Sequence, residues 1–239
     1  MDLRLDGHVA FVTGAARGIG RCIAETLRDL GARTASGDLT APEIDDVLGV
    51  EIDVTDEDSV ARAFEAIERE LGKVDLLVLN AGVLRRGPLE ETTLADWQLH
   101  MDVNLTGAFL CARRALPAMR EAGYGRLVVI GSSAGITGAG AAPPGLPAYA
   151  ASKAGVMTLA KAIASEYAAE GVTANAIAPT LIRTEMTANV PESFAEGVIP
   201  MRRFGKPEEV ASLVAYLCTP HAGFITGEIV DVNGGFLID

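Results

Sequence analysis

The chain has 239 residues, of which 49% are hydrophobic and 22% are charged, and this balance excludes a disordered protein. Its formal net charge is −12 with no long run of lysine or arginine, which argues against a nucleic-acid partner because phosphate binding needs clustered cations. It has no signal-peptide pattern and no apolar run near the ~20 residues that cross a bilayer. We therefore expect a cytoplasmic protein without a membrane partner.

Seven segments are predicted to be strands. Six of them are apolar enough for the interior of a parallel sheet, namely Val9–Thr13, Val50–Asp53, Leu76–Asn80, Arg126–Ile130, Thr173–Ile177 and Ile229–Val232. A seventh, Arg33–Gly37, has few β-branched residues and is placed by the strand–helix rhythm.

Helical patterns separate these strands. A helix is predicted to begin near Ile19, and further helices are predicted over Asp56–Leu71, Leu94–Arg120 and Ala148–Glu170. In Asp56–Leu71 the apolar residues recur at helical spacing and form one stripe that can pack on a sheet. The alternation predicts a single α/β domain over residues 1–239, with a doubly wound parallel sheet of about seven strands and helices on both faces. In such folds ligands bind beyond the carboxyl ends of the strands.

The three cysteines, Cys22, Cys111 and Cys218, are far apart in the sequence and form no CxxC pair, which indicates reduced thiols rather than disulfides. The three histidines, at positions 8, 100 and 221, are also dispersed and show no metal-ligand spacing. We therefore expect no metal cofactor.

A glycine-rich loop follows the first strand. In Thr13–Gly20, Gly14 permits a tight turn, Gly18 lets the backbone approach a pyrophosphate, and Gly20 allows the helix to pack on the strand. The spacing differs from the common GxGxxG, and a plain strand–helix turn is the alternative. The position of the loop between a strand and a helix, with Arg17 and Ile19 beside the glycines, favours a dinucleotide cofactor.

Two charged residues bear on which dinucleotide binds. Asp38 follows the second strand, about 20 residues after the loop, where a carboxylate accepts hydrogen bonds from the adenosine ribose and repels a 2′-phosphate. Arg17 acts in the opposite direction, because a cation in the glycine loop can pair with that phosphate. The direct repulsion by Asp38 favours NAD over NADP, unless Asp38 is only a solvated turn residue.

Tyr149 and Lys153 are the strongest candidates for chemistry. Four residues apart on a helix, their side chains lie on one face. A free phenol has a pKa of about 10, and a nearby ammonium favours the phenolate, which makes Tyr149 a usable acid or base. A YxxxK sequence alone is common by accident, so its surroundings decide its meaning.

Those surroundings resemble the short-chain dehydrogenase/reductase family over nearly the whole chain. Thr13–Gly20 matches the family's cofactor turn, Asp53-Val54 matches the pair that holds the adenine, and Asn80-Ala81-Gly82 is similar to the signature that stabilises the sheet beside the cofactor. The resemblance implies a Rossmann-type fold and an NAD(P)-dependent oxidoreductase.

The resemblance also implies a catalytic set. Ser132 and Asn104 match the family's catalytic serine and asparagine, and Tyr149 and Lys153 complete the group. Ser132 can hydrogen-bond the substrate oxygen. Tyr149 exchanges a proton with the substrate oxygen, Lys153 anchors the nicotinamide ribose, and Asn104 holds a water for proton relay. Ser133 is the rival for Ser132, which is preferred because it stands three residues before a glycine, as in the family.

The sequence departs from the family pattern at two places that are expected to border the pocket. Residues 138–147 form an apparent Gly/Pro/Ala insertion between Ser132 and Tyr149, expected at the edge of the substrate pocket. Ala178-Pro179-Thr180 stands where the family usually has Pro-Gly, so Pro179 and Thr180 border a changed turn, whereas Ile182 and Thr184 still match the segment that contacts the nicotinamide and the phosphates.

Residues 181–205 show no clear period, and we interpret them as a substrate lid, with a plain surface loop as the alternative. Arg85 and Arg86 follow the NAG signature and can reach an anionic substrate, although solvent exposure is the more common use of arginine. The end of the chain, residues 230–235, resembles the family's last strand, and the resemblance implies a homotetramer formed through the two long helices and this strand.

The first function hypothesis is an NAD-preferring enzyme that interconverts a secondary alcohol and a ketone, with Tyr149 as general acid/base. The alternative is a 3-oxoacyl-[acyl-carrier-protein] reductase that uses NADPH, which residues 203–210 resemble but Asp38 opposes. A resemblance of residues 80–86 to sugar-acid and cyclic-diol dehydrogenases gives a further option. From another class, a non-catalytic dinucleotide sensor is disfavoured because all four catalytic residues are present. The length leaves little room for the substrate domain of a dehydratase or epimerase.

Overall fold

The computed structural model describes residues 3–138 and 145–238, and its centre is one parallel sheet. The strands are β1 (Val9–Thr13), β2 (Arg33–Asp38), β3 (Leu48–Glu51), β4 (Leu76–Leu79), β5 (Gly125–Ile130), β6 (Val172–Pro179) and β7 (Ile229–Val232). Their order across the sheet is β3-β2-β1-β4-β5-β6-β7, and every neighbouring pair is parallel. This order confirms the predicted doubly wound, Rossmann-type fold.

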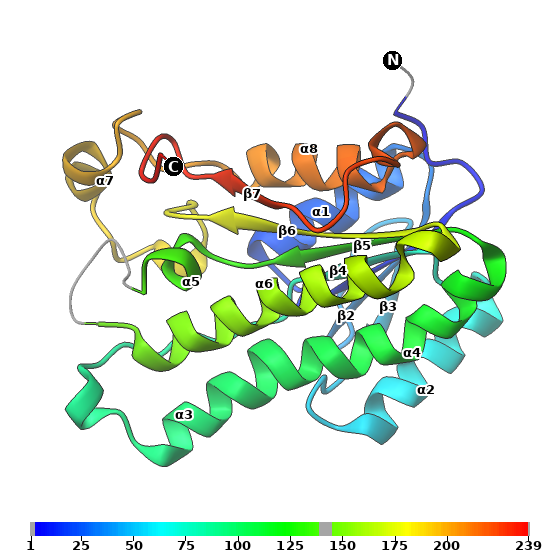
Figure 1. Ribbon diagram of the computed structural model, residues 1–239, viewed down its shortest axis with the longest axis horizontal. Coiled ribbons are helices and arrows are strands. Elements are labelled where there is room, and N and C mark those ends of the chain that lie inside the picture. The colour runs from blue at the N-terminus through cyan, green and yellow to red at the C-terminus, as the bar shows by residue number, and fades with distance from the viewer. Residues whose placement is uncertain (1–2, 139–144, 239) are drawn as a thin grey trace.

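Helices cover both faces of the sheet (Figure 1). The helices α1 (Gly18–Asp29) and α8 (Pro207–Cys218) pack on one face, and α2 (Glu57–Glu70), α4 (Gly107–Ala122) and α6 (Pro147–Tyr167) pack on the other. Because successive strand residues point to opposite faces, Phe11 enters the core beneath α2 while Ala10 and Val12 enter the core beneath α1 and α8. Among the described residues, no helix has the length and apolar character of a membrane span.

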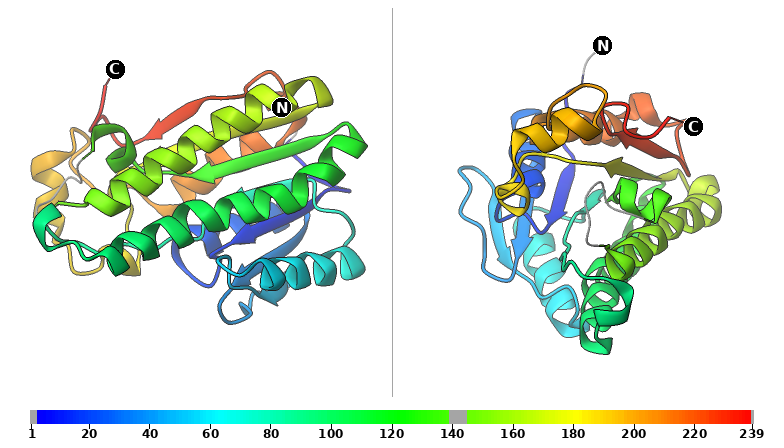
Figure 2. Two further views of the ribbon diagram at one scale, coloured as in Figure 1. Left: turned by 60° about the horizontal axis from the view of Figure 1, so that its bottom comes forward. Right: turned by 90° about the vertical axis from the view of Figure 1, so that its left-hand side faces the viewer.

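Shorter helices lie between these elements. They are the helices α3 (Leu94–Met101), α5 (Ser133–Thr137) and α7 (Glu192–Val198), the 3₁₀ turns η1 (Leu89–Glu91), η3 (Ala168–Glu170), η4 (Glu185–Thr187) and η5 (Pro220–Ala222), and the π-helical segment η2 (Asp102–Thr106). Figure 2 shows α5 and α7 at the end of the molecule where β5, β6 and β7 terminate. Ligand-binding groups are expected at this carboxyl end of the sheet.

The long helix predicted over Leu94–Arg120 is present, but it contains a π-helical turn. The structure divides this range into α3, the π-helical η2 and α4. Asn104 lies in η2, and its side chain bonds to the backbone of Val83, outside the helix. A π segment inside a helix often marks a functional position, and this one brings Asn104 to the end of β4.

The strand β3 lies two residues earlier than predicted and ends before Asp53. The Asp53 carboxylate accepts hydrogen bonds from the Thr55 backbone N–H at 2.9 Å and from its hydroxyl at 2.7 Å. This aspartate-centred turn directs the chain away from the sheet toward α2.

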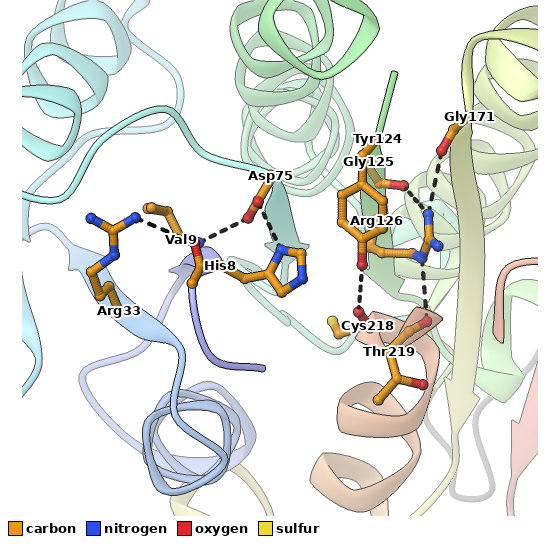
Figure 3. Close-up of polar contacts among 11 residues, drawn as sticks. His8, Val9, Arg33, Asp75, Tyr124, Gly125, Arg126, Gly171, Cys218 and Thr219 are labelled. Carbon is orange, nitrogen blue, oxygen red and sulfur yellow. Dashed lines mark hydrogen bonds and ion pairs between the residues drawn. The ribbon is translucent and has the colours of Figure 1, made fainter. Parts of the chain in front are cut away.

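The amino ends of the central strands are joined by a polar cluster (Figure 3). His8 Nδ1 bonds to the Asp75 carboxylate at 2.8 Å, and the His8 ring stacks on the Tyr124 ring at a centroid distance of 4.9 Å. The buried guanidinium of Arg126 lies 4.2 Å from the Tyr124 centroid and donates to the Gly171 carbonyl. These contacts hold the end of the sheet that lies away from the candidate site.

Candidate active site

Two adjoining pockets lie at the carboxyl ends of the strands. The larger is a cleft of about 760 Å³ lined by the predicted cofactor residues Gly14, Arg17, Gly18, Ile19, Gly20, Asp38, Asp53, Val54, Asn80, Ala81, Gly82 and Thr184. The smaller, of about 120 Å³, is lined by Ser132, Tyr149, Lys153, Pro179, Thr180 and Ile182. Ile19, Asn80, Gly82 and Thr184 line both, so the two pockets are continuous.

The glycine loop has a backbone that requires glycine. Gly14 and Gly18 have positive φ values of 67° and 58°. A Cβ on Gly14 would lie 2.6 Å from the Ala81 Cα atom, and a Cβ on Gly20 would overlap the Gly14 carbonyl. Each position therefore excludes a side chain, as the sequence predicted from turn and packing arguments.

The amino terminus of α1, which follows the glycine loop, is suited to bind an anion. Arg17 is the N-cap of α1, none of the described side chains caps the helix, and its first turn contains no acidic residue. The backbone N–H groups of the first turn are directed toward the cleft end of the helix, where its dipole favours negative charge. The loop, the bare helix terminus and the size of the cleft fit the pyrophosphate and adenosine of a dinucleotide.

Asn80 holds the glycine loop through side-chain hydrogen bonds. Its Nδ2 donates to the carbonyls of Thr13 at 3.0 Å and Gly14 at 2.8 Å, while the Thr13 hydroxyl accepts from the backbone N–H groups of Asn80 and Ala81. These bonds tie the end of β4 to the glycine loop. Asn80 thus stabilises the cofactor turn.

Asp38 and Arg17 both lie on the wall of the cleft. The Asp38 carboxylate, at the end of β2, accepts from the backbone N–H groups of Ala16 at 3.1 Å and Leu39 at 2.8 Å. It therefore carries its negative charge beside the glycine loop, while the Arg17 side chain is exposed on the same cleft. Both charges that bear on the predicted cofactor preference therefore line one cleft.

Tyr149, Lys153 and Ser132 converge in the smaller pocket. Tyr149 and Lys153 lie one turn apart on α6, with the Lys153 Nζ atom 5.8 Å from the Tyr149 ring centroid. The Lys153 ammonium donates to the Ile130 carbonyl, at the end of β5, at 2.7 Å. Ser132 is the N-cap of α5 and hydrogen-bonds to Tyr149. Ser133 is not among the described residues that line this pocket, so the geometry favours Ser132.

Burial has the largest effect on the pKa values of Tyr149 and Lys153. Burial raises the pKa of Tyr149, opposite to the shift toward the phenolate that was expected from Lys153, while the hydrogen bond to Ser132 and the positive charge of Arg86 act against this rise. Burial lowers the pKa of Lys153 to about 8, because its charged form is desolvated. The pKa values of both side chains therefore differ from those of exposed tyrosine and lysine, as is common at functional sites.

Asn104 lies behind this pocket and is buried. Its Oδ1 accepts from the Val83 N–H at 2.7 Å, and its Nδ2 donates to the Val83 carbonyl at 3.1 Å and the Ser152 hydroxyl at 2.9 Å. The Asn104 side chain therefore serves to join η2, the chain after β4 and α6. Ser152 and Val83 were absent from the sequence predictions, because their contacts with Asn104 join distant segments.

Residues 181–205 contain the short helices η4 and α7 rather than forming a plain surface loop. Leu181 and Gly205 are hydrogen-bonded at 2.9 Å, and a small apolar cluster around Phe204 packs between the two ends of the segment. A Cβ on Gly18 would lie 3.4 Å from the Thr184 Cγ2 atom, so the segment rests on the glycine loop. Most of the predicted insertion, residues 139–144, lies outside the described residues.

Within residues 3–138 and 145–238, no group of three His, Cys, Asp or Glu side chains could hold a metal ion.

Comparisons with known proteins agree with this geometry. Residues 14–237 match the family described as enoyl-(acyl carrier protein) reductase. The chain is 39% identical over 250 residues to the 3-oxoacyl-[acyl-carrier-protein] reductase FabG of Aquifex aeolicus, covering 98% of this chain and 99% of the relative. It is 38% identical over 244 residues to FabG of Escherichia coli, covering 98% of each chain.

Two solved structures are also similar. A protein assigned as a gluconate dehydrogenase from Agrobacterium tumefaciens has a TM-score of 0.90 at 33% identity, covering 99% of this chain and 98% of its own. The structure of gox2181 has a TM-score of 0.90 at 36% identity, covering 98% of this chain and 97% of its own. The chain belongs to the short-chain dehydrogenase/reductase family of NAD(P)-dependent oxidoreductases, which act on alcohol and ketone groups.

Proposed function

We propose that this enzyme interconverts a secondary alcohol and a ketone with Tyr149 as general acid/base and with NAD as the preferred cofactor. The observation that carries the proposal is the convergence of Ser132, Tyr149 and Lys153 in a pocket that opens into the dinucleotide cleft. A phenol, a hydroxyl and an ammonium at this junction are suited to an oxygen atom whose proton moves as a hydride is exchanged.

When bound, the nicotinamide cofactor supplies or accepts the hydride. Ser132 holds the substrate oxygen, and its bond to Tyr149 directs the phenol toward the same atom. Tyr149 donates a proton to that oxygen in reduction and accepts it in oxidation. Lys153, with a pKa of about 8, can carry positive charge near neutral pH and so favours the phenolate. By family resemblance Lys153 also anchors the nicotinamide ribose, and Asn104 holds a water for proton relay.

The preference for NAD rests on Asp38. Its carboxylate is held at the end of β2 by two backbone N–H groups, so it cannot easily withdraw from the adenosine side of the cleft. A fixed negative charge there accepts ribose hydroxyls and repels a 2′-phosphate. The alternative is a 3-oxoacyl-[acyl-carrier-protein] reductase that uses NADPH, in which Arg17 would pair with the phosphate; the similarity to FabG supports this activity.

An anionic substrate is supported by Arg86. Arg86 lies two residues after Leu84, which packs with Tyr149, and its positive charge opposes the rise that burial causes in the pKa of Tyr149. A carboxylate or phosphate on the substrate would meet this charge. The similar structure assigned as a gluconate dehydrogenase acts, by its name, on a sugar acid, which agrees with this proposal.

A panel of carbonyl compounds tests the reaction. Acetoacetyl-coenzyme A, 5-oxo-gluconate and neutral ethyl acetoacetate would each be supplied with NADH and with NADPH, and crotonyl-coenzyme A would test reduction of a carbon–carbon double bond. We expect turnover of a ketone, with NADH preferred. Conversion of crotonyl-coenzyme A alone, or no turnover of any ketone, would contradict the proposed chemistry.

Tyr149→Phe tests the mechanism. Removing the phenol oxygen is expected to lower kcat by about 10²-fold or more, the usual scale for general acid–base catalysis, without weakening cofactor binding equally. Tyr167→Phe is the control, because Tyr167 lies at the far end of the same helix. Turnover near the wild-type rate in Tyr149→Phe would contradict the assignment and would make a non-catalytic role, such as dinucleotide sensing, the better explanation.

We also propose that the enzyme is a cytoplasmic homotetramer and that residues 181–205 act as a substrate lid. Phe109 on α4 is 43% exposed and Phe224, shortly before β7, is fully exposed, which supports contacts through the two regions used by the family. Light scattering of the wild type and of Phe224→Asp tests the assembly, with a smaller particle expected for the variant. An unchanged mass for Phe224→Asp would exclude Phe224 from the interface.

A further inference from the structure

Residues 83–87, here called the strap, follow β4 and Gly82, which lines the smaller pocket, and lead past the apolar cluster against which Tyr149 packs. Alternate backbone N–H groups of the strap are held by other elements: Val83 donates to Asn104 Oδ1 at 2.7 Å, Arg85 to His100 Nε2 at 3.0 Å and Gly87 to the Gly145 carbonyl at 3.2 Å. The strap is therefore fixed along its length, although it has no regular secondary structure.

Of the two residues between these anchor points, Leu84 is the one that packs with Tyr149. Leu84 packs with Tyr149 against the small apolar cluster of Ala134, Leu146 and Ala150. Arg86 acts electrostatically on the Tyr149 phenol. The position of the strap therefore affects the packing and the electrostatic surroundings of Tyr149.

His100 is the central anchor and is only 1% exposed. Its Nδ1 lies 2.7 Å from the Asp96 carbonyl, which can only accept, so Nδ1 carries the hydrogen. Its Nε2 accepts the Arg85 N–H and therefore carries none. Both partners are satisfied only by the neutral imidazole with hydrogen on Nδ1, and a protonated ring would turn a second donor against the Arg85 N–H.

The same imidazole touches the catalytic tyrosine. The ring centroids of His100 and Tyr149 are 6.3 Å apart and their planes meet at 80°, an edge-to-face arrangement that is favourable for aromatic rings. His100 lies on α3 and Tyr149 on α6, so the contact joins two helices. One side chain thus contacts both the strap and the phenol ring.

We propose that His100 is a positioning residue of the reaction: its Nε2 holds the strap in place for substrate binding, and its ring holds the Tyr149 ring in the orientation for proton transfer. The inference rests on the proposed role of Tyr149. The inference assigns two functions to the His100 side chain, and two different substitutions can test them separately.

His100→Phe keeps a ring against Tyr149 but removes the acceptor for the Arg85 N–H. His100→Gln keeps an amide oxygen near the position of Nε2 but removes the ring. In both variants the ion pair of Arg85 with Asp96, at 2.5 Å, still links the strap to α3, so the fold is expected to persist. His8→Phe is the matched control, because His8 stacks on Tyr124 at the amino ends of the strands, away from the candidate site (Figure 3).

The experiment is single-turnover reduction by stopped flow, with NADH-bound enzyme and the panel ketone of highest kcat/KM. For His100→Phe we expect the half-saturating ketone concentration to rise about tenfold at a nearly unchanged maximal rate, because a lost hydrogen bond loosens the strap. For His100→Gln we expect the maximal rate to fall about tenfold at a nearly unchanged half-saturating concentration, because the phenol loses its support. NADH affinity is expected to stay within about twofold in both.

Several results would overturn the inference. Wild-type rates and half-saturation in both variants would show that His100 has no positioning role, and the same parameter changing in both would show that its two contacts are not separable. A change in His8→Phe equal to that in the His100 variants would indicate general destabilisation. The proposed function fails separately, by retained turnover in Tyr149→Phe.

Discussion

The side-chain nitrogen of Asn104 lies 2.9 Å from the hydroxyl of Ser152, and this contact joins the π segment η2 to the helix that carries Tyr149. The Ser152 hydroxyl in turn donates to the Tyr149 carbonyl at 2.8 Å. A continuous set of hydrogen bonds therefore runs from the strap through Asn104 to the first turn of α6. The relative positions of the candidate proton-relay residues depend on this buried connection.

Ser152→Ala tests the connection. The Asn104 nitrogen would keep the Val83 carbonyl as a partner, so we expect unfolding by urea to show a loss of only about 1 kcal/mol. We also expect the single-turnover rate to fall severalfold, because Asn104 and Tyr149 would no longer be tied together. Ser212→Ala, which removes a bond to the Glu208 carbonyl on the solvent-exposed side of α8, is the control. An unchanged rate in Ser152→Ala would show that the link is only structural.

Asp38→Asn tests the cofactor preference. The substitution removes the negative charge but leaves an oxygen that can accept a backbone N–H. We expect the ratio of kcat/KM for NADH over NADPH to fall at least about tenfold, mainly through a lower KM for NADPH, because the repulsion of the 2′-phosphate disappears. Arg17→Ala is expected to move the ratio in the opposite direction. A ratio unaffected by Asp38→Asn would assign the preference to another residue.

Cys111→Ala tests how buried thiols affect stability in alkali. Burial raises the pKa of the Cys111 thiol from 9.0 to about 12. Between these values the unfolded chain loses the thiol proton while the folded chain keeps it, so the contribution to stability falls as the pH rises from about 9 toward 12. From pH 8 to pH 10 the wild type should lose about 1.4 kcal/mol more than Cys111→Ala.

Urea unfolding at the two pH values, under reducing conditions, measures this difference. Lys153 titrates over the same range with the opposite sign, but it is present in both proteins and cancels in the comparison. Cys218→Ala should give a difference of the same sign, because burial also raises the pKa of its thiol to about 12. If the free energy of unfolding changed with pH equally in the wild type and in the variants, the raised pKa values of these buried thiols would be refuted.

Arg202→Gly is expected to stabilise the protein. Arg202 is exposed and has a φ of 55°, in the left-handed region that disfavours residues with a Cβ. Glycine removes this strain at some cost in chain entropy, so we expect a gain of about 0.5–1 kcal/mol in thermal or urea unfolding. Asp46, with a φ of 57°, is the matched site, and Asp46→Gly should gain less because aspartate tolerates this conformation better. A loss of stability in Arg202→Gly would show that its side chain makes a compensating contact.

The sequence predicted the elements whose pattern is local. The run Val9–Thr13 was predicted as a strand with the bounds that the structure has, because five buried residues in a row can only be a central strand here. The π-helical turn around Asn104 was not predicted. That segment has ordinary helical residues, and its π turn is held by hydrogen bonds to Val83 and Ser152, which are distant in the sequence.

The sequence by itself determined the family, the parallel sheet, the glycine loop and the pairing of Tyr149 with Lys153, because these depend on spacing along the backbone. Only the tertiary structure decided that the Lys153 ammonium meets the Ile130 carbonyl and that His100 contacts both the strap and Tyr149. Those contacts join segments that no periodicity relates. They exist because packing of the helices on the sheet brings the segments together.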